Sequence, residues 1–201
     1  QMCIRDSVLT DFLSTGTYTA KREFYKTTSP SMDILVSSNL ERLLYHVTGS
    51  DAEVAGLMKS LSETGSYTVR PETLKAIQES FDCGWSSEEQ VAGEIRARYE
   101  KDGYLCDTHT AVAFHVAAQK KRDGVPMVVL STASPFKFPR SVLEALGHTA
   151  PENDFEAMQA LEEATGRTAP ASLAVLRQKA ERFSTVIDPA QIAEVALGCQ
   201  A

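Results

Sequence analysis

The sequence has no long apolar run, few cysteines and fewer basic than acidic residues. No stretch of about 18 apolar residues occurs, so we expect no transmembrane helix. No positively charged start is followed by an apolar stretch, which predicts no signal peptide. The 20 lysines and arginines are outnumbered by 27 aspartates and glutamates, and the net charge is −7. This charge argues against nucleic acid as a partner, because phosphate backbones attract basic surfaces.

The motifs of several common enzyme and metal-binding classes are also absent. The four cysteines, Cys3, Cys83, Cys106 and Cys199, form no Cys-x-x-Cys pair, so we expect free thiols in a reducing cytoplasm. The histidines outside residues 106–110 have no metal-ligand spacing with cysteine or carboxylate, and we expect no metal. Neither a P-loop, a G-x-G-x-x-G nor a G-x-S-x-G motif is present.

What the sequence does contain is a series of helical patterns with clear start and stop signals. Hydrophobic residues make up 43% of the chain, which is enough for a core. Capping boxes predict one helix from Ser38 to Gly49 and a second from Ser50 to Gly65. Further helices are expected from Pro71, from a capping box at Ser86 and Glu89 to Gly103, and over residues 110–121, 140–146, 152–165, 171–183 and 189–197.

Strand patterns are few. Pro126–Leu130 is apolar on both faces and is predicted as a central parallel strand covered by helices. Ile34–Val36 is a shorter apolar run, expected as a strand or a buried extended segment. Because a sheet needs at least three strands or helix cover, the other strands are expected elsewhere. The predicted class is α/β, mostly helical with few strands and an incomplete sheet.

Two segments with chemically useful side chains follow or begin predicted elements. The loop of residues 131–138 (STASPFKF) follows the predicted strand, and ligands bind outside such strand ends in open α/β sheets. Its three hydroxyls and Lys137 suit an anion or a cofactor ring, but a Ser- and Pro-rich turn explains them equally well. In residues 106–110 (CDTHT), Asp107 or Thr108 is expected to cap a helix. His109 then lies in the first turn, where a neutral imidazole or a nearby anion is favoured; simple capping with an exposed histidine is the alternative.

A third candidate lies at residues 29–33 (SPSMD), followed by residues 37–39 (SSN). Helix N-termini with hydroxyls suit phosphate groups, and Arg42 is placed to reach the same helix end. The alternative is purely structural, because Ser38 is already expected to cap its own helix.

Five strings, in this order, resemble threonine synthase: residues 11–18 (DFLSTGTY), 29–34 (SPSMDI), 37–44 (SSNLERLL), 107–111 (DTHTA) and 131–138 (STASPFKF). The resemblance implies the C-terminal portion of a fold-type-II enzyme that uses pyridoxal 5'-phosphate (PLP). That enzyme is a carbon–oxygen lyase acting on phosphates, converting O-phospho-L-homoserine and water into L-threonine and phosphate in the last step of threonine biosynthesis. PLP serves as the electron sink. Residues 8–146 are then expected to form part of the catalytic domain, and residues 147–201 a helical extension packing on it.

The resemblance also assigns site residues. It implies that the hydroxyl of Thr132 meets the pyridine nitrogen of PLP, and a neutral hydroxyl does not force that nitrogen to be protonated. Weaker matches for substrate contacts or loop anchoring are Ser31, Asn39, Arg42 and Lys137, together with His109, whose motif has no assigned role. The family usually has proline where this chain has Thr108, which removes some rigidity from the turn.

By the same resemblance, the Schiff-base lysine and the glycine-rich phosphate loop are upstream and absent from this chain. We therefore expect no catalytic residue here, an inactive isolated chain, and the missing N-terminal half as its partner. Residues 1–7 (QMCIRDS) show no helical or strand period and resemble translated adapter sequence; we interpret them as an artefact, with a cut before Val8. The alternatives are another fold-type-II PLP enzyme, tryptophan synthase β-like or threonine dehydratase-like, or a non-catalytic helical binding module if the chain is complete.

Overall fold

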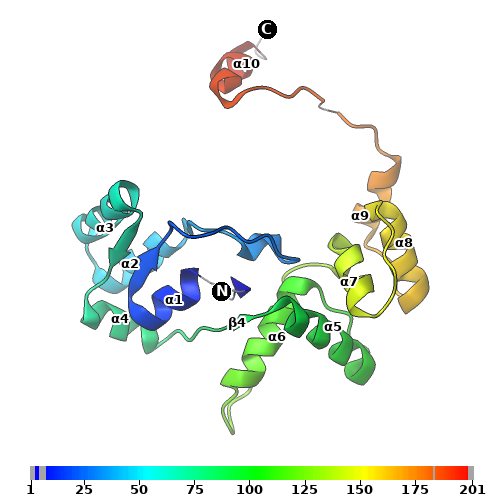
Figure 1. The fold of residues 1–201 in the computed structure, drawn as a ribbon, viewed down its shortest axis with the longest axis horizontal. Coiled ribbons are helices and arrows are strands. Elements are labelled where there is room, and N and C mark those ends of the chain that lie inside the picture. Colours follow the sequence, from blue (N-terminus) through cyan, green and yellow to red (C-terminus); the bar gives the residue numbers. More distant parts are fainter. Residues whose placement is uncertain (1–2, 5–7, 183, 199–201) are drawn as a thin grey trace.

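The computed structural model describes residues 3–4, 8–182 and 184–198, and within this part the chain is mostly helical (Figure 1). Of the segment interpreted as an artefact, only the backbone of residues 3–4 is described; the rest lies outside. The helices are α1 (Val8–Thr15), α2 (Leu40–Thr48), α3 (Asp51–Thr64), α4 (Pro71–Gln78), α5 (Glu88–Asp102), α6 (Thr108–Lys120), α7 (Pro139–Ala145), α8 (Asp154–Thr165), α9 (Ala171–Ala174) and α10 (Ile192–Gly198). Short 3-10 turns are η1 (Pro30–Met32), η2 (Pro135–Lys137), η3 (Val175–Gln178) and η4 (Pro189–Gln191). No helix in the described part is long and apolar enough to cross a membrane.

The first hydrophobic core lies among α1 to α4 and a small antiparallel pair of strands, β2 (Thr17–Thr19) and β3 (Ser66–Thr68). Tyr18 and Tyr67 are opposite each other in this pair, and their rings stack with centroids 5.2 Å apart. Phe12 of α1 meets both rings edge-on at 5.9 Å. Such aromatic contacts add to the burial of apolar area, so three short elements are held together by one ring cluster.

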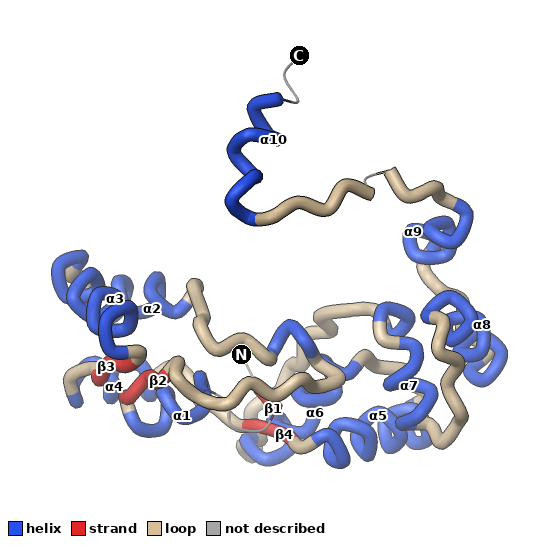
Figure 2. The backbone as a smooth tube through the Cα atoms, turned by 45° about the horizontal axis from the view of Figure 1, so that its top comes forward, coloured by secondary structure: helices blue, strands red, loops and turns tan. Residues whose placement is uncertain are grey.

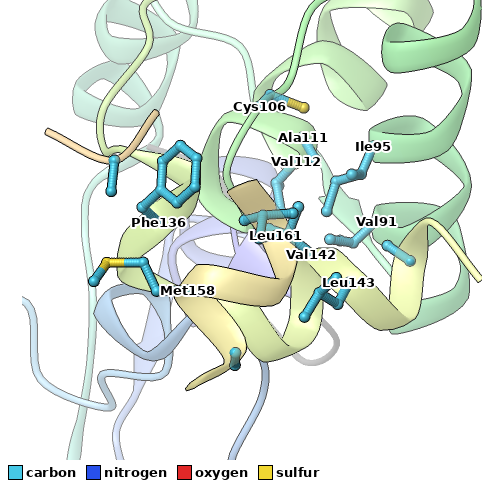
Figure 3. Packing of buried hydrophobic residues seen from close by; sticks show 13 residues of the cluster. Val91, Ile95, Cys106, Ala111, Val112, Phe136, Val142, Leu143, Met158 and Leu161 are labelled. Carbon is cyan, nitrogen blue, oxygen red and sulfur yellow. The ribbon is translucent and has the colours of Figure 1, made fainter. Parts of the chain in front are cut away.

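The second core lies among α5 to α8 (Figure 3). Val91 and Ile95 from α5, Val112 from α6, Val142 from α7 and Leu161 from α8 are each at most 1% exposed. Residues 20–39 leave the first core after β2, run beside the second core and return to the first core at α2 (Figure 2). Met32 in this loop packs against both cores. The chain passes from the first core to the second through β4 (Trp85–Ser86), which pairs in parallel with β1 (Cys3–Ile4).

Most of the predicted helix ends are confirmed, but one predicted capping box does not form and another was placed one residue too early. Ser50 caps α3, since its Oγ accepts the backbone N–H of Glu53 at 3.2 Å. The residue before α2 is Asn39, with no side-chain cap, so the box predicted at Ser38 does not form. Helix α5 is capped by Ser87 with Gln90 instead of Ser86 with Glu89. Ser86 is buried and paired in β4, which leaves Ser87 as the cap.

The two strand predictions were wrong. Residues 126–130 form no strand in the described structure, and Met127, Val128 and Leu130 are 45%, 77% and 75% exposed. A strand needs a hydrogen-bonded neighbour, and no described segment pairs with this one. The short run at 34–36 is likewise neither a strand nor buried, with Ile34 and Val36 exposed. The described sheets have only two strands each.

The C-terminal helices are shorter than predicted. The helix expected over 171–183 consists of α9 and η3 and ends at Gln178; its predicted last residue lies outside the described part. Neither segment has a buried residue, and short helices without tertiary packing are marginal in water. Helix α8 packs on α7, whereas α10 stands apart from both cores (Figure 1). None of the described residues of α10 is buried.

The second core predicts that replacing a buried leucine costs more free energy of unfolding than replacing an exposed one. Leu161→Ala should lower the free energy of unfolding by about 3 kcal/mol, because it removes a fully buried side chain from close-packed neighbours. Leu197→Ala is the matched control: Leu197 is 71% exposed on α10, so the change should stay within about 0.5 kcal/mol. Urea unfolding followed by circular dichroism measures both. Equal losses for the two variants would contradict the core described here.

Candidate functional site

Helix α6 begins at a buried carboxylate. Asp107 is 0% exposed, and its Oδ1 accepts the backbone N–H of His109 at 2.9 Å and of Thr110 at 3.3 Å. These bonds satisfy N–H groups that would otherwise lack partners in the first turn of a helix. Of the two residues considered as caps from the sequence, Asp107 is therefore the one that caps α6.

The His109 ring is buried, not exposed as the simple capping alternative assumed. Its Nδ1 lies 3.2 Å from Asp107 Oδ1, and its Nε2 lies 3.3 Å from the backbone nitrogen of Ser31. Because the N–H of Ser31 points at Nε2, that nitrogen must accept, and the ring proton belongs on Nδ1, where it is donated to the carboxylate. The same ring packs against Phe138, with centroids 4.8 Å apart. His109 thus joins the residue 29–33 loop and the residue 131–138 loop.

Thr110 connects the same carboxylate to the second loop. Its hydroxyl donates to Asp107 Oδ2 in a short hydrogen bond and accepts the backbone N–H of Thr132 at 3.2 Å. The Thr132 side chain faces the surface, and its hydroxyl has no hydrogen bond to another described residue. The loop is therefore held by its backbone while the hydroxyl that the resemblance assigned to PLP stays free.

Thr108, at the position where the resemblance implied a proline, adds a further link. Its hydroxyl donates to the backbone carbonyl of Thr28 at 2.8 Å. The Thr28 hydroxyl in turn donates to Glu88 Oε2 at 2.7 Å, which ties this end of the loop to α5. Proline has no side-chain donor, so the threonine replaces rigidity of the turn with a hydrogen bond across it.

Hydrogen bonds decide the charge state of this site. Burial raises the pKa of Asp107, but the hydrogen bonds from the side chains and backbone N–H groups of His109 and Thr110 outweigh it and hold the pKa below its ordinary value. The carboxylate is therefore ionised at neutral pH. Burial, with the nearby charge of Asp107, raises the pKa of the adjacent Cys106 thiol to about 12. Cys106 is thus a packing residue in the thiol form.

The sequence-predicted residues fall into two groups. Ser31, His109 and Thr132 are brought together at the start of α6, and Lys137 is exposed on η2 next to Phe138. Asn39 and Arg42 are elsewhere, on the exposed start of α2, where Arg42 donates to Asn39 Oδ1 at 2.5 Å. Ser31 takes part through its backbone N–H instead of its hydroxyl.

Sequence reasoning did not recognise Asp107, Thr110 and Phe138 as site residues. The dense run of hydroxyl, carboxylate and imidazole groups at residues 107–110 was the signal, but their partners lie 22 to 80 residues away in the chain.

A cleft of about 790 Å³ lies near β4, away from the loop cluster, and contains the Asp82–Lys120 ion pair at 2.8 Å. None of the sequence-predicted site residues lines it.

This combination of a mostly helical chain, short strand pairs and a loop cluster at one helix start is that of the C-terminal portion of a fold-type-II PLP enzyme. The profile described as "Threonine synthase, C-terminal" matches residues 110–196. The PLP-bound threonine synthase from Brucella melitensis superposes with a TM-score of 0.80 at 36% identity, covering 98% of this chain and 39% of that one. Yeast threonine synthase gives 0.75 at 26% identity, over 96% of this chain and 39% of that one. The resemblance to the C-terminal part of threonine synthase is confirmed.

Curated relatives agree with this assignment. Threonine synthase from Pseudomonas aeruginosa is 38% identical over 143 residues, and threonine synthase-like 1 from Pongo abelii is 35% identical over 144 residues. The matches cover 70% and 71% of this chain, respectively. The chain spans only 30% and 19% of the length of these relatives.

The lowered pKa of Asp107 predicts how stability depends on pH. Since the folded pKa lies below the unfolded one, the carboxylate stabilises the fold fully above about pH 4, and this contribution is lost as pH falls through the folded pKa. Asp107→Asn should therefore cost about 2 kcal/mol at pH 7, and the difference from wild type should shrink in acid. Urea titrations from pH 3 to pH 7 measure it. Asp123→Asn, at an exposed position, is the control and should change little; a pH-independent cost at Asp107 would refute the assigned charge.

The cysteines give a second test. Cys83 is half-buried and Cys106 is 1% exposed; Cys199 and the side chain of Cys3 lie outside the described residues. In a background with Cys3 and Cys199 replaced by serine, iodoacetamide at pH 8 should modify Cys83 alone, because a buried thiol with a high pKa supplies almost no thiolate. Mass spectrometry counts the adducts. Unfolding in urea should add the second one, whereas fast labelling of Cys106 in the native chain would contradict its burial.

Proposed function

We propose that this chain acts as the C-terminal part of a threonine synthase, which converts O-phospho-L-homoserine and water into L-threonine and phosphate with PLP. The observation that carries the proposal is the loop cluster at the start of α6. There, two of the five threonine synthase-like strings, residues 29–34 and 131–138, converge on a third, residues 107–111. The match to a PLP-bound enzyme over 98% of the chain supports it. Residues 8–146 are proposed as part of the catalytic domain and residues 147–201 as its extension.

The residues present fit a role in holding PLP at one edge. When bound, PLP supplies an electron sink for negative charge that develops on a substrate carbon. The exposed Thr132 hydroxyl, on a loop held by its backbone, would give the ring nitrogen a neutral hydrogen-bond partner. Lys137, exposed five residues further on, would attract the substrate phosphate locally despite the net charge of −7.

The remaining candidates would act on the substrate side or anchor loops. Both ring nitrogens of His109 are already engaged, by Asp107 and by the N–H of Ser31, so we assign this histidine to holding the loop. The Ser31 hydroxyl is exposed beside it and would contact substrate. Asn39 and Arg42 form a polar pair on α2 that would contact substrate or anchor the neighbouring loop.

The partner we propose is the remainder of the same enzyme. Residues 125–130 expose a row of large apolar side chains without a neighbouring strand in the described structure. Exposed apolar segments with unpaired backbone groups favour association. The PLP-bound relative is more than twice as long as this chain, so its remaining length is enough to cover such a segment. The lysine that binds the cofactor covalently is proposed to lie in that remainder.

The proposal predicts the behaviour of Thr132 variants in the complete enzyme. Thr132→Ala should lower kcat for phosphate release from O-phospho-L-homoserine about tenfold, because a hydrogen bond to the cofactor ring is lost. Thr132→Ser should keep most of the activity. Ser131→Ala removes the neighbouring exposed hydroxyl and serves as the control with unchanged rate. Full activity in Thr132→Ala would refute the role of Thr132, and absence of this reaction in the wild type would refute the proposed function.

A separate measurement addresses the isolated chain. Mixed with PLP and reduced with borohydride, it should yield no stoichiometric adduct, and a specific adduct at Lys137 would overturn the assignment of that lysine to charge attraction.

The alternative function is that of a non-catalytic helical binding module. It would fold cooperatively as a monomer, whereas the exposed segment at 125–130 predicts self-association that Val128→Lys weakens.

A further inference from the structure

We infer that Asp107 is a positioning residue that sets the spacing between the Ser31 loop and the Thr132 loop through two separable arms. The inference concerns the geometry of this chain, and it rests on the proposed function only for what the two loops hold. In one arm, Oδ1 binds His109, which receives the N–H of Ser31. In the other, Oδ2 binds Thr110, which receives the N–H of Thr132.

Both arms end on backbone N–H groups, so they fix the course of the loop backbones. A bond to the backbone fixes where a loop runs, and it leaves the side chain at that position free. Thr132 and Ser31 are both exposed, so their hydroxyls remain available to a ligand while their N–H groups are held. The arms therefore suit the placement of two ligand-contacting loops relative to each other.

Burial makes the arms stiff. Asp107, His109 and Thr110 are 0%, 5% and 1% exposed, so water does not compete for their hydrogen bonds. Hydrogen bonds in such surroundings are electrostatically stronger than in water, and linked bonds strengthen one another. An ionised carboxylate accepts on both oxygens, which lets it receive the His109 and Thr110 donors at once. An amide at this position offers only one acceptor oxygen, so it supports only one arm fully.

The Ser31 loop is also held by a second hydrogen bond, from Thr108, which is separate from the two arms. Thr108 holds the carbonyl of Thr28, three residues before Ser31, and Thr28 also bonds to Glu88. This anchor does not pass through the Asp107 side chain. Loss of the His109 arm should therefore loosen the loop locally at Ser31, without releasing its start at Thr28.

Hydrogen exchange at the two amides tests the inference in the 201-residue chain, at low micromolar concentration with single-residue mass spectrometry. Thr110→Val keeps the shape of threonine but loses its hydroxyl, and should speed exchange of the Thr132 amide about tenfold or more, with the Ser31 amide within about twofold of wild type. Thr110→Ser keeps the hydroxyl and should return the exchange rate of the Thr132 amide to that of the wild type. His109→Asn removes the ring that accepts the Ser31 N–H and packs on Phe138, so it should speed exchange mainly at the Ser31 amide, with a smaller effect at the Thr132 amide. Asp107→Ala removes both acceptor oxygens and should speed exchange of both amides.

The tautomer of His109 gives a readout that does not depend on any variant folding. In the wild type, imidazole ¹⁵N shifts should show a protonated Nδ1 and an unprotonated Nε2 at neutral pH. A protonated Nε2 would overturn the two-arm arrangement. So would Thr110→Val and His109→Asn variants that each perturb both amides equally or neither.

A kinetic measurement separates this inference from the proposed function. In the complete enzyme, Thr110→Val should lower kcat about tenfold and Thr110→Ser should recover it, with KM changed less than kcat. If the wild type lacks threonine synthase activity, the proposed function fails, and the exchange pattern still decides the positioning role. If the wild type is active and Thr110→Val leaves kcat unchanged, the functional part of the positioning role is wrong.

Discussion

The arrangement of the loop cluster depends on one ionised carboxylate buried at the start of a helix. Asp107 accepts two backbone N–H groups of α6, the ring proton of His109 and the hydroxyl of Thr110. Each of these donors favours the charged form, and together they outweigh the cost of burial. Because His109 and Thr110 pass the interaction on to two distant loops, the helix cap also determines where those loops lie.

The two hydrophobic cores give this cap a rigid support. Helices α5, α6 and α7 pack around Val91, Val112 and Val142, which fixes the start of α6. The loop that carries Ser31 comes from the first core and is held in place by Met32, which contacts both cores. The site is thus formed where a loop of the first core passes the start of α6. Its loops are rich in serine and proline, and their backbone groups are hydrogen-bonded to buried side chains.

The strand prediction at residues 126–130 was wrong in an informative way. The pattern of a proline followed by four apolar residues is that of a buried strand, yet Val128 and Leu130 are among the most exposed large hydrophobic residues described. The local apolar pattern favours an extended backbone, but strand pairing requires a neighbouring segment with free N–H and C=O groups. The same reasoning explains the C-terminal segment after residue 178, where helical periodicity was not accompanied by a packing surface.

Sequence alone determined the helix ends at glycine residues and the start of α3. Gly49, Gly65 and Gly103 adopt the left-handed conformation that ends a helix, and Ser50 caps its helix as predicted, because these interactions are local. The motif strings also carried the resemblance to threonine synthase, and Ser31, His109 and Thr132 were named as candidates from them. Only the tertiary structure decided that these three meet, that Asn39 and Arg42 lie elsewhere, and that Asp107 joins the loops. Those contacts span up to 80 residues, and no local pattern encodes which distant backbone N–H a buried side chain will face.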